Sequence, residues 1–221
     1  MEEVVRVMRR AMAGGTGDGE DGGDSAWHPV LEALVRTAPP GGIVHWPLMW
    51  RNLKSEWVSK TGRVVQIGDA AHSTVPSSAA GETLAIEDAV TMAACLRLAG
   101  ADKVALGNRV YNLLCYERAS CIQKMAFVNA QTLGHTTDWD ALRKNPEKAR
   151  LRYPKWLFRH DPEKYVDERW EQAVAHLVGG REFRNTNIPP GHLFREWTID
   201  EIQRQIGEGK RVEDLLDGDW S

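Results

Sequence analysis

Several patterns that assign a chain to a functional class are missing from this sequence. No apolar run reaches the roughly 18 residues that a membrane span needs, and the amino terminus has no signal-peptide core. The histidines form no HxxxH or HExxH spacing, so no metal site is predicted. Neither a GxSxG nucleophile elbow nor a Walker phosphate loop occurs. These absences argue against a membrane partner and against the common metal, serine-hydrolase and phosphate-loop sites.

The chain also has few cysteines and a small net charge. The three cysteines, Cys95, Cys115 and Cys121, lie within predicted helices and have neither CxxC nor histidine-paired spacing, which is typical of inert thiols in a reducing cytosol. The formal net charge is −3 at pH 7 over 221 residues, so no excess of one sign favours nucleic acid or an anionic membrane. We expect a cytoplasmic protein that binds neither.

The most informative stretch runs from Gly62 to Leu98 and begins GRVVQIGDAAH. Its β-branched residues over 64–67 predict a short buried strand that ends at Gly68 and Asp69. A Gly-containing bend then leads into an amphipathic helix with apolar residues at helical spacing: Ile86, Ala89, Val90, Ala93 and Leu96. A strand that brings a carboxylate to the amino end of a helix forms a ligand-binding geometry, because the helix dipole and free N–H groups lie beside it.

The rest of the chain is predicted to be mostly helical. Helices are expected over 28–36 and 104–131, after the N-cap Asp161, and after the capping box that opens at Thr198. Short strands are expected over 43–50 and 56–59. The predicted domain organisation is an amino-terminal helix (1–12), a flexible Gly/Asp-rich linker (13–26) and one domain (27–221).

A family resemblance rests on the same stretch. GRVVQIGDAAH, followed by Pro76, a Gly-bearing bend and AIEDA, resembles the second flavin-contacting motif of FAD-dependent aromatic-ring monooxygenases, the salicylate-hydroxylase-like group of fungal secondary metabolism. The resemblance continues through YERAS, TDWDALRKNPE and NTNIPPGHLFREWTIDE, which look like the carboxyl-terminal half of such an enzyme. It implies an α+β fold, in which short strands of a substrate sheet and the GDAAH strand pack with several α-helices. If flavin is retained, it implies cofactor contacts at Gly68, Asp69, Pro76 and Gly81.

Two features depart from the family pattern. The family's βαβ unit with GxGxxG, which holds the ADP part of FAD, has no counterpart in this sequence, since Gly14 to Gly23 follows no strand. Where the family usually has GxG, this chain has Ala79-Ala80-Gly81 followed by Glu82. A carboxylate there suits the helix dipole but disfavours a reduced flavin ring. We therefore expect no cofactor, with FAD as the alternative.

The candidate catalytic residues are Asp69, His72 and Glu82, because carboxylates and an imidazole beside one cavity can transfer protons. Simpler roles stay open: His72 bonds backbone within its turn, and Glu82 is only a helix-start charge. Candidate substrate-binding residues lie on or just after the predicted strand before the motif, where aromatic side chains could equally fill the core: His45, Trp46, Met49 and Arg51.

Three functions are compatible with these patterns. The favoured one is a cofactor-independent enzyme of fungal natural-product biosynthesis that cyclises, isomerises, dehydrates or pericyclically closes a polyketide- or terpenoid-like intermediate. The second is the FAD-binding half of a split monooxygenase that needs a partner chain, and the third is a non-catalytic binding protein. We also expect a homodimer through the strands near Trp46 and Trp57 or the first helix, because faces that the parent fold buries would be exposed.

Overall fold

The computed structural model describes residues 29–39, 41–44, 46–132, 143–146, 151 and 153–220. The predicted helix over 1–12 and the predicted linker over 13–26 lie outside the described residues. The chain divides into two units, Met1–Leu48 and Met49–Ser221. The described part of the first unit holds helix α2 (Pro29–Thr37), close to the helix predicted over 28–36.

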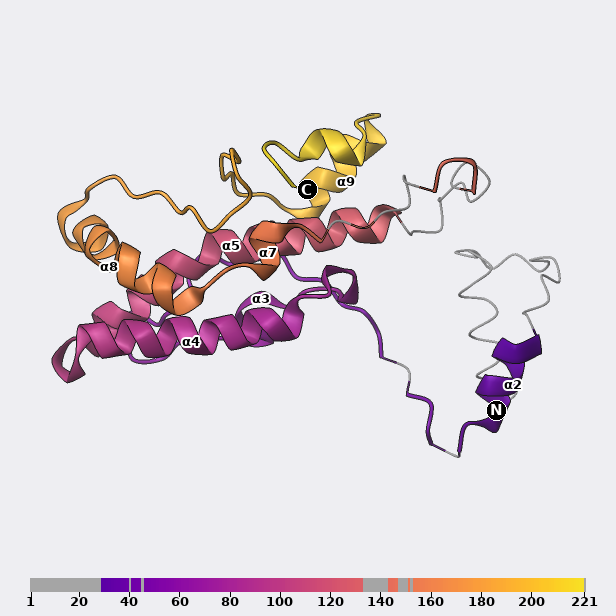
Figure 1. Cartoon of the computed structure of the whole chain (residues 1–221), viewed down its shortest axis with the longest axis horizontal. Coiled ribbons are helices and arrows are strands. Elements are labelled where there is room, and N and C mark those ends of the chain that lie inside the picture. Colours follow the sequence, from indigo (N-terminus) through magenta and orange to yellow (C-terminus); the bar gives the residue numbers. More distant parts are fainter. Residues whose placement is uncertain are drawn as a thin grey trace. The chain divides into compact units, whose positions relative to one another are not determined.

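Two long helices form the body of the second unit. Helix α4 (Gly81–Ala99) and helix α5 (Val104–Thr132) are joined by the short turn η2 (Ala101–Lys103) and lie side by side in opposite directions (Figure 1). Helix α8 (Pro162–Gly179) packs against both of them. The predicted helix over 104–131 is confirmed, because its apolar stripe is the buried centre of this layer: Val110, Leu114, Cys121, Ile122 and Met125.

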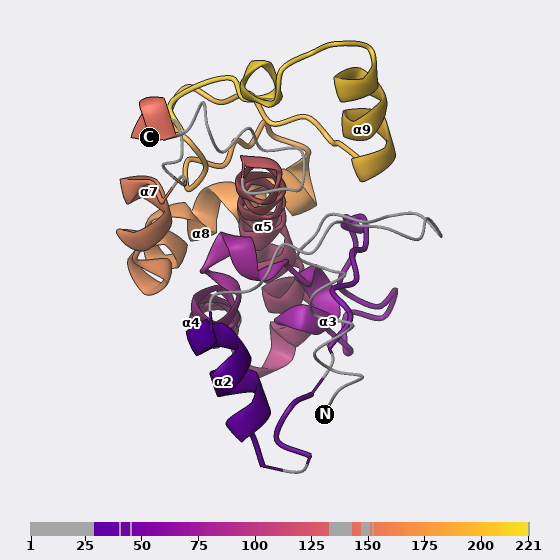
Figure 2. The ribbon, with the colours of Figure 1, turned by 90° about the vertical axis from the view of Figure 1, so that its right-hand side faces the viewer.

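Shorter helices surround this layer. They are α3 (Asp69–His72), η1 (Pro76–Ser78), α7 (Lys155–Phe158), α9 (Ile199–Gly207) and η4 (Val212–Leu215). Figure 2 looks nearly along α5 and shows α3 and α4 on one side of that helix and α9 on the other. Both α3 and η1 contact α5, so the GDAAH motif and the turn that follows it pack against the longest helix in the described part of the chain.

The predicted helix starts are confirmed by their caps. The Asp161 carboxylate accepts a hydrogen bond from the N–H of Lys164 at 3.0 Å, with Pro162 in the first turn of α8. The Thr198 hydroxyl accepts one from the N–H of Glu201 at 3.2 Å at the start of α9. Each cap satisfies a backbone donor that the helix itself leaves free, which explains why these two starts can be read from sequence.

The predicted α+β fold is wrong for the described residues. Their β-structure is a single isolated antiparallel bridge between Val58 and Val65, and the stretches predicted as strands over 43–50 and 56–59 form no sheet. Val64 is 67% exposed, so the predicted buried strand over 64–67 is also wrong. A strand becomes part of a sheet only when neighbouring strands form hydrogen bonds with its backbone groups. In the described residues, the backbone of residues 64–66 pairs with that of residues 57–59 on one side and with no second strand on the other.

Burial in this fold also makes the cysteine thiols unreactive. Cys95, Cys115 and Cys121 are all free and buried, and burial raises the pKa of the Cys95 thiol to about 12. Among the described residues no helix combines the length and the apolar character that crossing a membrane requires.

Candidate functional site

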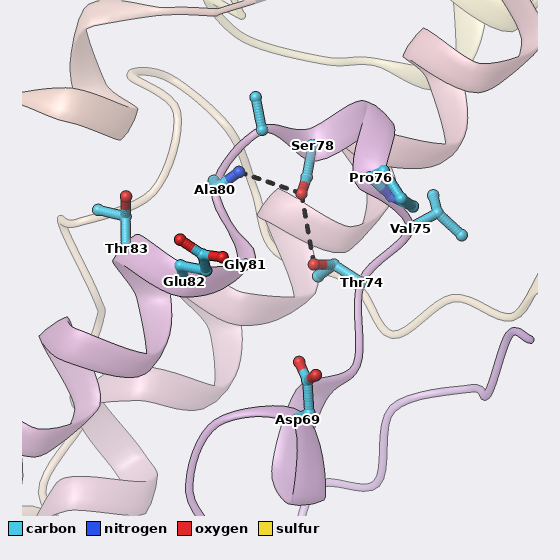
Figure 3. A pocket seen from close by; sticks show the side chains of 10 residues that line it. Asp69, Thr74, Val75, Pro76, Ser78, Ala80, Gly81, Glu82 and Thr83 are labelled. Atoms are coloured by element: carbon cyan, nitrogen blue, oxygen red, sulfur yellow. Dashed lines mark hydrogen bonds between the residues drawn. The ribbon is translucent and has the colours of Figure 1, made fainter. Parts of the chain in front are cut away.

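A cavity of about 410 Å³ lies between α3 and the amino end of α4 (Figure 3). Its walls come from the first residue of α3, the turn η1 with its flanks, and the first turn of α4. The lining residues are Asp69, Thr74, Val75, Pro76, Ser78, Ala79, Ala80, Gly81, Glu82 and Thr83. This is the Gly-containing bend before α4 that the sequence singles out as part of a ligand-binding geometry, although the described residues that precede it form no strand.

Asp69 forms one wall of the cavity. It opens α3 directly after Gly68, whose φ of 56° lies in the left-handed region that suits glycine. The side chain of Asp69 is exposed, and Figure 3 shows its carboxylate pointing from α3 toward the turn that carries Thr74 and Ser78. An exposed carboxylate at this point can accept hydrogen bonds from the hydroxyl groups of a ligand.

The amino end of α4 forms the opposite wall. The N-cap residue Ala80 has no side chain that could cap the helix, so the N–H groups of Gly81, Glu82 and Thr83 have no acceptor within the helix. The aligned peptide dipoles add positive potential at the same end. A Cβ on Gly81 would lie 3.1 Å from the Thr74 Oγ1, so glycine keeps this wall open. The helix start therefore offers backbone donors to the cavity.

The turn between these walls is fixed by hydrogen bonds. The Ser78 hydroxyl donates to the Thr74 Oγ1 at 3.3 Å and accepts from the N–H of Ala80 at 3.2 Å (Figure 3). The next helix behind the turn is α5: the Ser77 hydroxyl donates to the carbonyl of Ala126 at 2.7 Å, and the Asn129 amide donates to the carbonyl of Ser77 at 3.1 Å. The cavity wall is thus anchored to the core.

The three predicted catalytic residues are not brought together. Asp69 and Glu82 line the cavity, whereas His72 is buried and absent from its lining. The His72 Nε2 lies 2.6 Å from the Oδ2 of Asp88, inside the protein. His72 therefore has a side-chain partner rather than the backbone bond that the simpler interpretation assigned to it. Of the predicted flavin contacts, Asp69, Pro76 and Gly81 line the cavity, and Gly68 is buried beside it.

Of the predicted substrate-binding residues, Met49 and Arg51 belong to the second unit, and neither lines the cavity. His45 lies outside the described residues, and Trp46 belongs to the unit Met1–Leu48 and is 80% exposed. Met49 is also 80% exposed. The Arg51 guanidinium instead donates to the carbonyl of Ala70, within α3, at 2.8 Å. Arg51 thus supports the short helix that carries Asp69.

Sequence reasoning missed Thr74, Ser78 and Asp88. The first two are small hydroxyl residues in a turn, a composition that usually marks an ordinary loop. Asp88 is buried on α4 opposite the predicted apolar stripe, of which Ile86 is 66% exposed. The signal that could have found it is the acidic pair Glu87-Asp88 inside an otherwise apolar helix, since buried acids need partners. In the described residues no group of three His, Cys, Asp or Glu side chains could hold a metal ion.

Comparison with known proteins shows which proteins this chain resembles. Residues 32–103 match the family model described as FAD binding domain. The chain is 62% identical to the FAD-dependent monooxygenase nsrK of Aspergillus novofumigatus, over 89% of this chain and 43% of that protein. It is 58% identical to the FAD-dependent monooxygenase mdpD of Emericella nidulans, over 97% of this chain and 40% of that protein. The chain is homologous to fungal FAD-dependent monooxygenases.

The same relationship is seen in a solved structure. The native crystal structure of FqzB superimposes with a TM-score of 0.65 at 30% sequence identity, covering 79% of this chain and 44% of that one. The chain thus spans about two fifths of the length of the relatives that it matches, and it fits their carboxyl-terminal part. The predicted family resemblance is confirmed at this level.

Proposed function

We propose that this chain forms the part of a FAD-dependent monooxygenase that contacts the flavin end of the cofactor. The observation that carries the proposal is one cavity faced by the Asp69 carboxylate on one side and by the uncapped start of a 19-residue helix on the other. The names of the relatives and the match to a FAD binding domain support it.

The residues present fit such a cofactor. A flavin ring has carbonyl and nitrogen acceptors along its pyrimidine edge, and the free N–H groups of Gly81, Glu82 and Thr83 are donors. The ribityl chain has hydroxyl groups, for which Asp69 supplies an acceptor. The absence of a side chain at Gly81 allows close approach to the backbone, because a Cβ there would already crowd Thr74.

When bound, FAD would supply the redox chemistry that a monooxygenase needs. This chain's own residues would hold it: Asp69 would accept hydrogen bonds from its hydroxyl groups, the start of α4 would donate to the ring edge, and Val75 and Pro76 would form an apolar part of the wall. The chain spans about two fifths of the length of its relatives. We therefore also propose, and do not take from the relatives, that the whole enzyme is a monooxygenase and that its substrate is polyketide- or terpenoid-like.

A cofactor-independent cyclase or isomerase is the second candidate. Glu82 favours it, since a second carboxylate lines the cavity beside Asp69 where a reduced flavin would meet negative charge. Two carboxylates around one cavity can serve as acid and base for proton transfer. His72 would take no direct part, because it does not line the cavity.

Titration of the purified chain with riboflavin and with FAD separates the two candidates. Riboflavin is a sufficient probe because the proposed contacts involve only the ring and the ribityl chain. We expect quenching of flavin fluorescence on binding. Asp69→Ala should weaken that binding roughly 10-fold or more, since it removes a charged hydrogen-bond acceptor.

Asp102→Asn is the matched control, because Asp102 is an exposed acid in η2 and does not line the cavity. The affinity of this variant for riboflavin should equal that of the unaltered chain. Failure of riboflavin and FAD to bind the unaltered chain would reject the flavin proposal and leave the cofactor-independent candidate. Equal affinity of the Asp69→Ala variant and the unaltered chain would show that flavin binds elsewhere.

A further inference from the structure

The helix that carries Asp69 is too short to be stable by itself. Helix α3 has four residues, and an isolated helix in water is marginal below about 12 residues. Its carboxylate can face the cavity in a fixed direction only if other parts of the fold hold both ends of α3. The side chains that do so therefore decide how the cavity presents Asp69.

One carboxylate of α4 reaches both ends of α3. The Asp88 Oδ2 accepts a hydrogen bond from the N–H of Gly68 at 2.8 Å, immediately before α3, and lies 2.6 Å from the Nε2 of His72, its last residue. Asp88 and His72 are both buried. Asp88 belongs to the helix whose first turn forms the other wall of the cavity, so it links the two walls through a single side chain.

The surroundings of this pair leave it little freedom. The ring of Trp57 packs against the ring of His72, with centroids 5.3 Å apart. Gly68 packs closely against α4, since a Cβ added to Gly68 would lie 3.4 Å from the Cβ of Ala85. Arg51 donates to the carbonyls of Ala70 and Ala71 from outside. Together these contacts hold α3 from three directions.

The pair is costly if stability is its only role. The Nδ1 of His72 and the Oδ1 of Asp88 are buried and have no hydrogen-bond partner in the structure. Buried polar atoms without partners lower the stability of the folded state, and well-packed apolar residues of similar size are often as stabilising as a buried ion pair. A polar pair at this position makes physical sense when it fixes one arrangement of the backbone.

We propose that Asp88 and His72 are positioning residues that hold α3 so that Asp69 faces the same cavity as the start of α4. The inference rests on the proposed function, because the ligand that Asp69 meets there is the flavin end of FAD. It predicts that Asp88 affects flavin binding only through Asp69. A role in overall stability would instead affect binding whether or not Asp69 is present.

A double-mutant cycle on riboflavin affinity tests this. Asp88→Ala should weaken binding roughly 10-fold in the unaltered chain, because the direction of Asp69 is lost, and should have no further effect in an Asp69→Ala background. Asp88→Asn should retain part of the affinity, since its amide oxygen can still accept from the N–H of Gly68. An equal loss in both backgrounds, or no loss at all, would overturn the inference.

Glu87→Gln is the matched control. Glu87 is the neighbouring buried acid of α4, but it pairs with Arg118 and not with α3, so the variant should unfold more easily and still bind riboflavin normally. A comparable loss of affinity in both variants would mean that Asp88 acts only through stability. If the unaltered chain binds no flavin, the proposed function fails, and the inference is then tested without a ligand.

Amide hydrogen exchange provides that ligand-free test. The N–H groups of Ala71 and His72 both donate to the carbonyl of Gly68 at 2.9 Å, so their exchange rates report whether α3 is formed. Asp88→Ala should accelerate exchange at these two amides well beyond any change in α5, and Glu87→Gln should not. Unchanged exchange in α3 of the Asp88→Ala variant would overturn the positioning role independently of flavin.

Discussion

Glu82 is the residue at which the two proposed functions differ most. It lies in the first turn of α4 and lines the cavity with an exposed side chain. Its negative charge interacts favourably with the helix dipole but repels the partially negative carbonyl and nitrogen acceptors of a flavin ring placed beside it. For a proton-transfer enzyme, the same carboxylate is a candidate acid or base.

Glu82→Gln should therefore raise riboflavin affinity by roughly two- to fivefold, since an exposed charge near a helix end contributes a fraction of a kcal/mol to about one. Fluorescence titration measures this effect, with Glu171→Gln on the exposed side of α8 as control. A fall in turnover of a supplied precursor without any flavin, at unchanged melting temperature, would instead favour the cofactor-independent candidate.

His160 makes the stability of the fold depend on pH. Burial, together with the charge of Arg118, lowers the pKa of the imidazole from 6.5 to about 3. Between these values the unfolded chain binds more protons than the folded one, so stability is lost as the pH falls below 6.5. The loss should be at most about 1 kcal/mol per pH unit, because solvent partly screens this half-buried ring.

Urea unfolding between about pH 7 and pH 4 checks this expectation. In His160→Gln the slope of unfolding free energy against pH should be smaller over that range. Identical slopes for the variant and the unaltered chain would assign the acid sensitivity to other groups.

At the scale of elements, one buried arginine ties the helices together. The Arg118 guanidinium on α5 binds both oxygens of Glu87 on α4, with its Nε 2.7 Å from Oε2 and its Nη2 2.9 Å from Oε1. It also donates to the carbonyls of Trp156, Leu157 and Asn187. Four separate segments thus meet at one side chain, which keeps the α4–α5 layer in register with the segments that cover it.

Arg118→Met should destabilise the protein by about 3–5 kcal/mol, because it leaves the Glu87 carboxylate buried without its partner. The double variant Glu87→Gln with Arg118→Met should recover part of that loss, since the uncompensated charge is gone. Denaturant unfolding of the single and double variants measures both effects. Losses that simply add would contradict a direct energetic coupling between the two side chains.

The elements also show where prediction from sequence reached its limit. The caps at Asp161 and Thr198 are local, so their side chains and the backbone N–H groups that they satisfy lie within three residues. The prediction of a buried strand over 64–67 is wrong because β-structure depends on a partner strand that can be distant in the sequence. The apolar pattern of α4 was read correctly as a helix, but Ile86 is exposed because Glu87 and Asp88 find buried partners.

For the whole molecule, the exposed apolar side chains bear on assembly. Ile86 on α4 and Val64 before α3 are 66% and 67% exposed, and Trp57, near which one interface was predicted, is buried. Exposed apolar surface favours association with another surface. The homodimer therefore stays a prediction, with the face around Ile86 as a further candidate interface.

Sedimentation velocity over a range of protein concentrations tests this prediction. We expect a concentration-dependent dimer, and Ile86→Glu should shift the equilibrium toward monomer by placing a charge in the interface. Val178→Glu, an equally apolar and exposed position at the end of α8, is the control. A monomer at all concentrations would contradict self-association.

The sequence by itself determined the family, the long helices and their capped starts, and the bend that forms the cavity. These features depend on contiguous residues: a motif, a helical repeat, or a cap within one turn. Only the tertiary structure decided that His72 turns away from the cavity toward Asp88, that Arg51 supports α3, and that Glu87 meets Arg118. The His72–Asp88 and Glu87–Arg118 pairings join residues 16 and 31 positions apart, and they form because a buried charge or polar group must find a partner wherever the packed helices bring one.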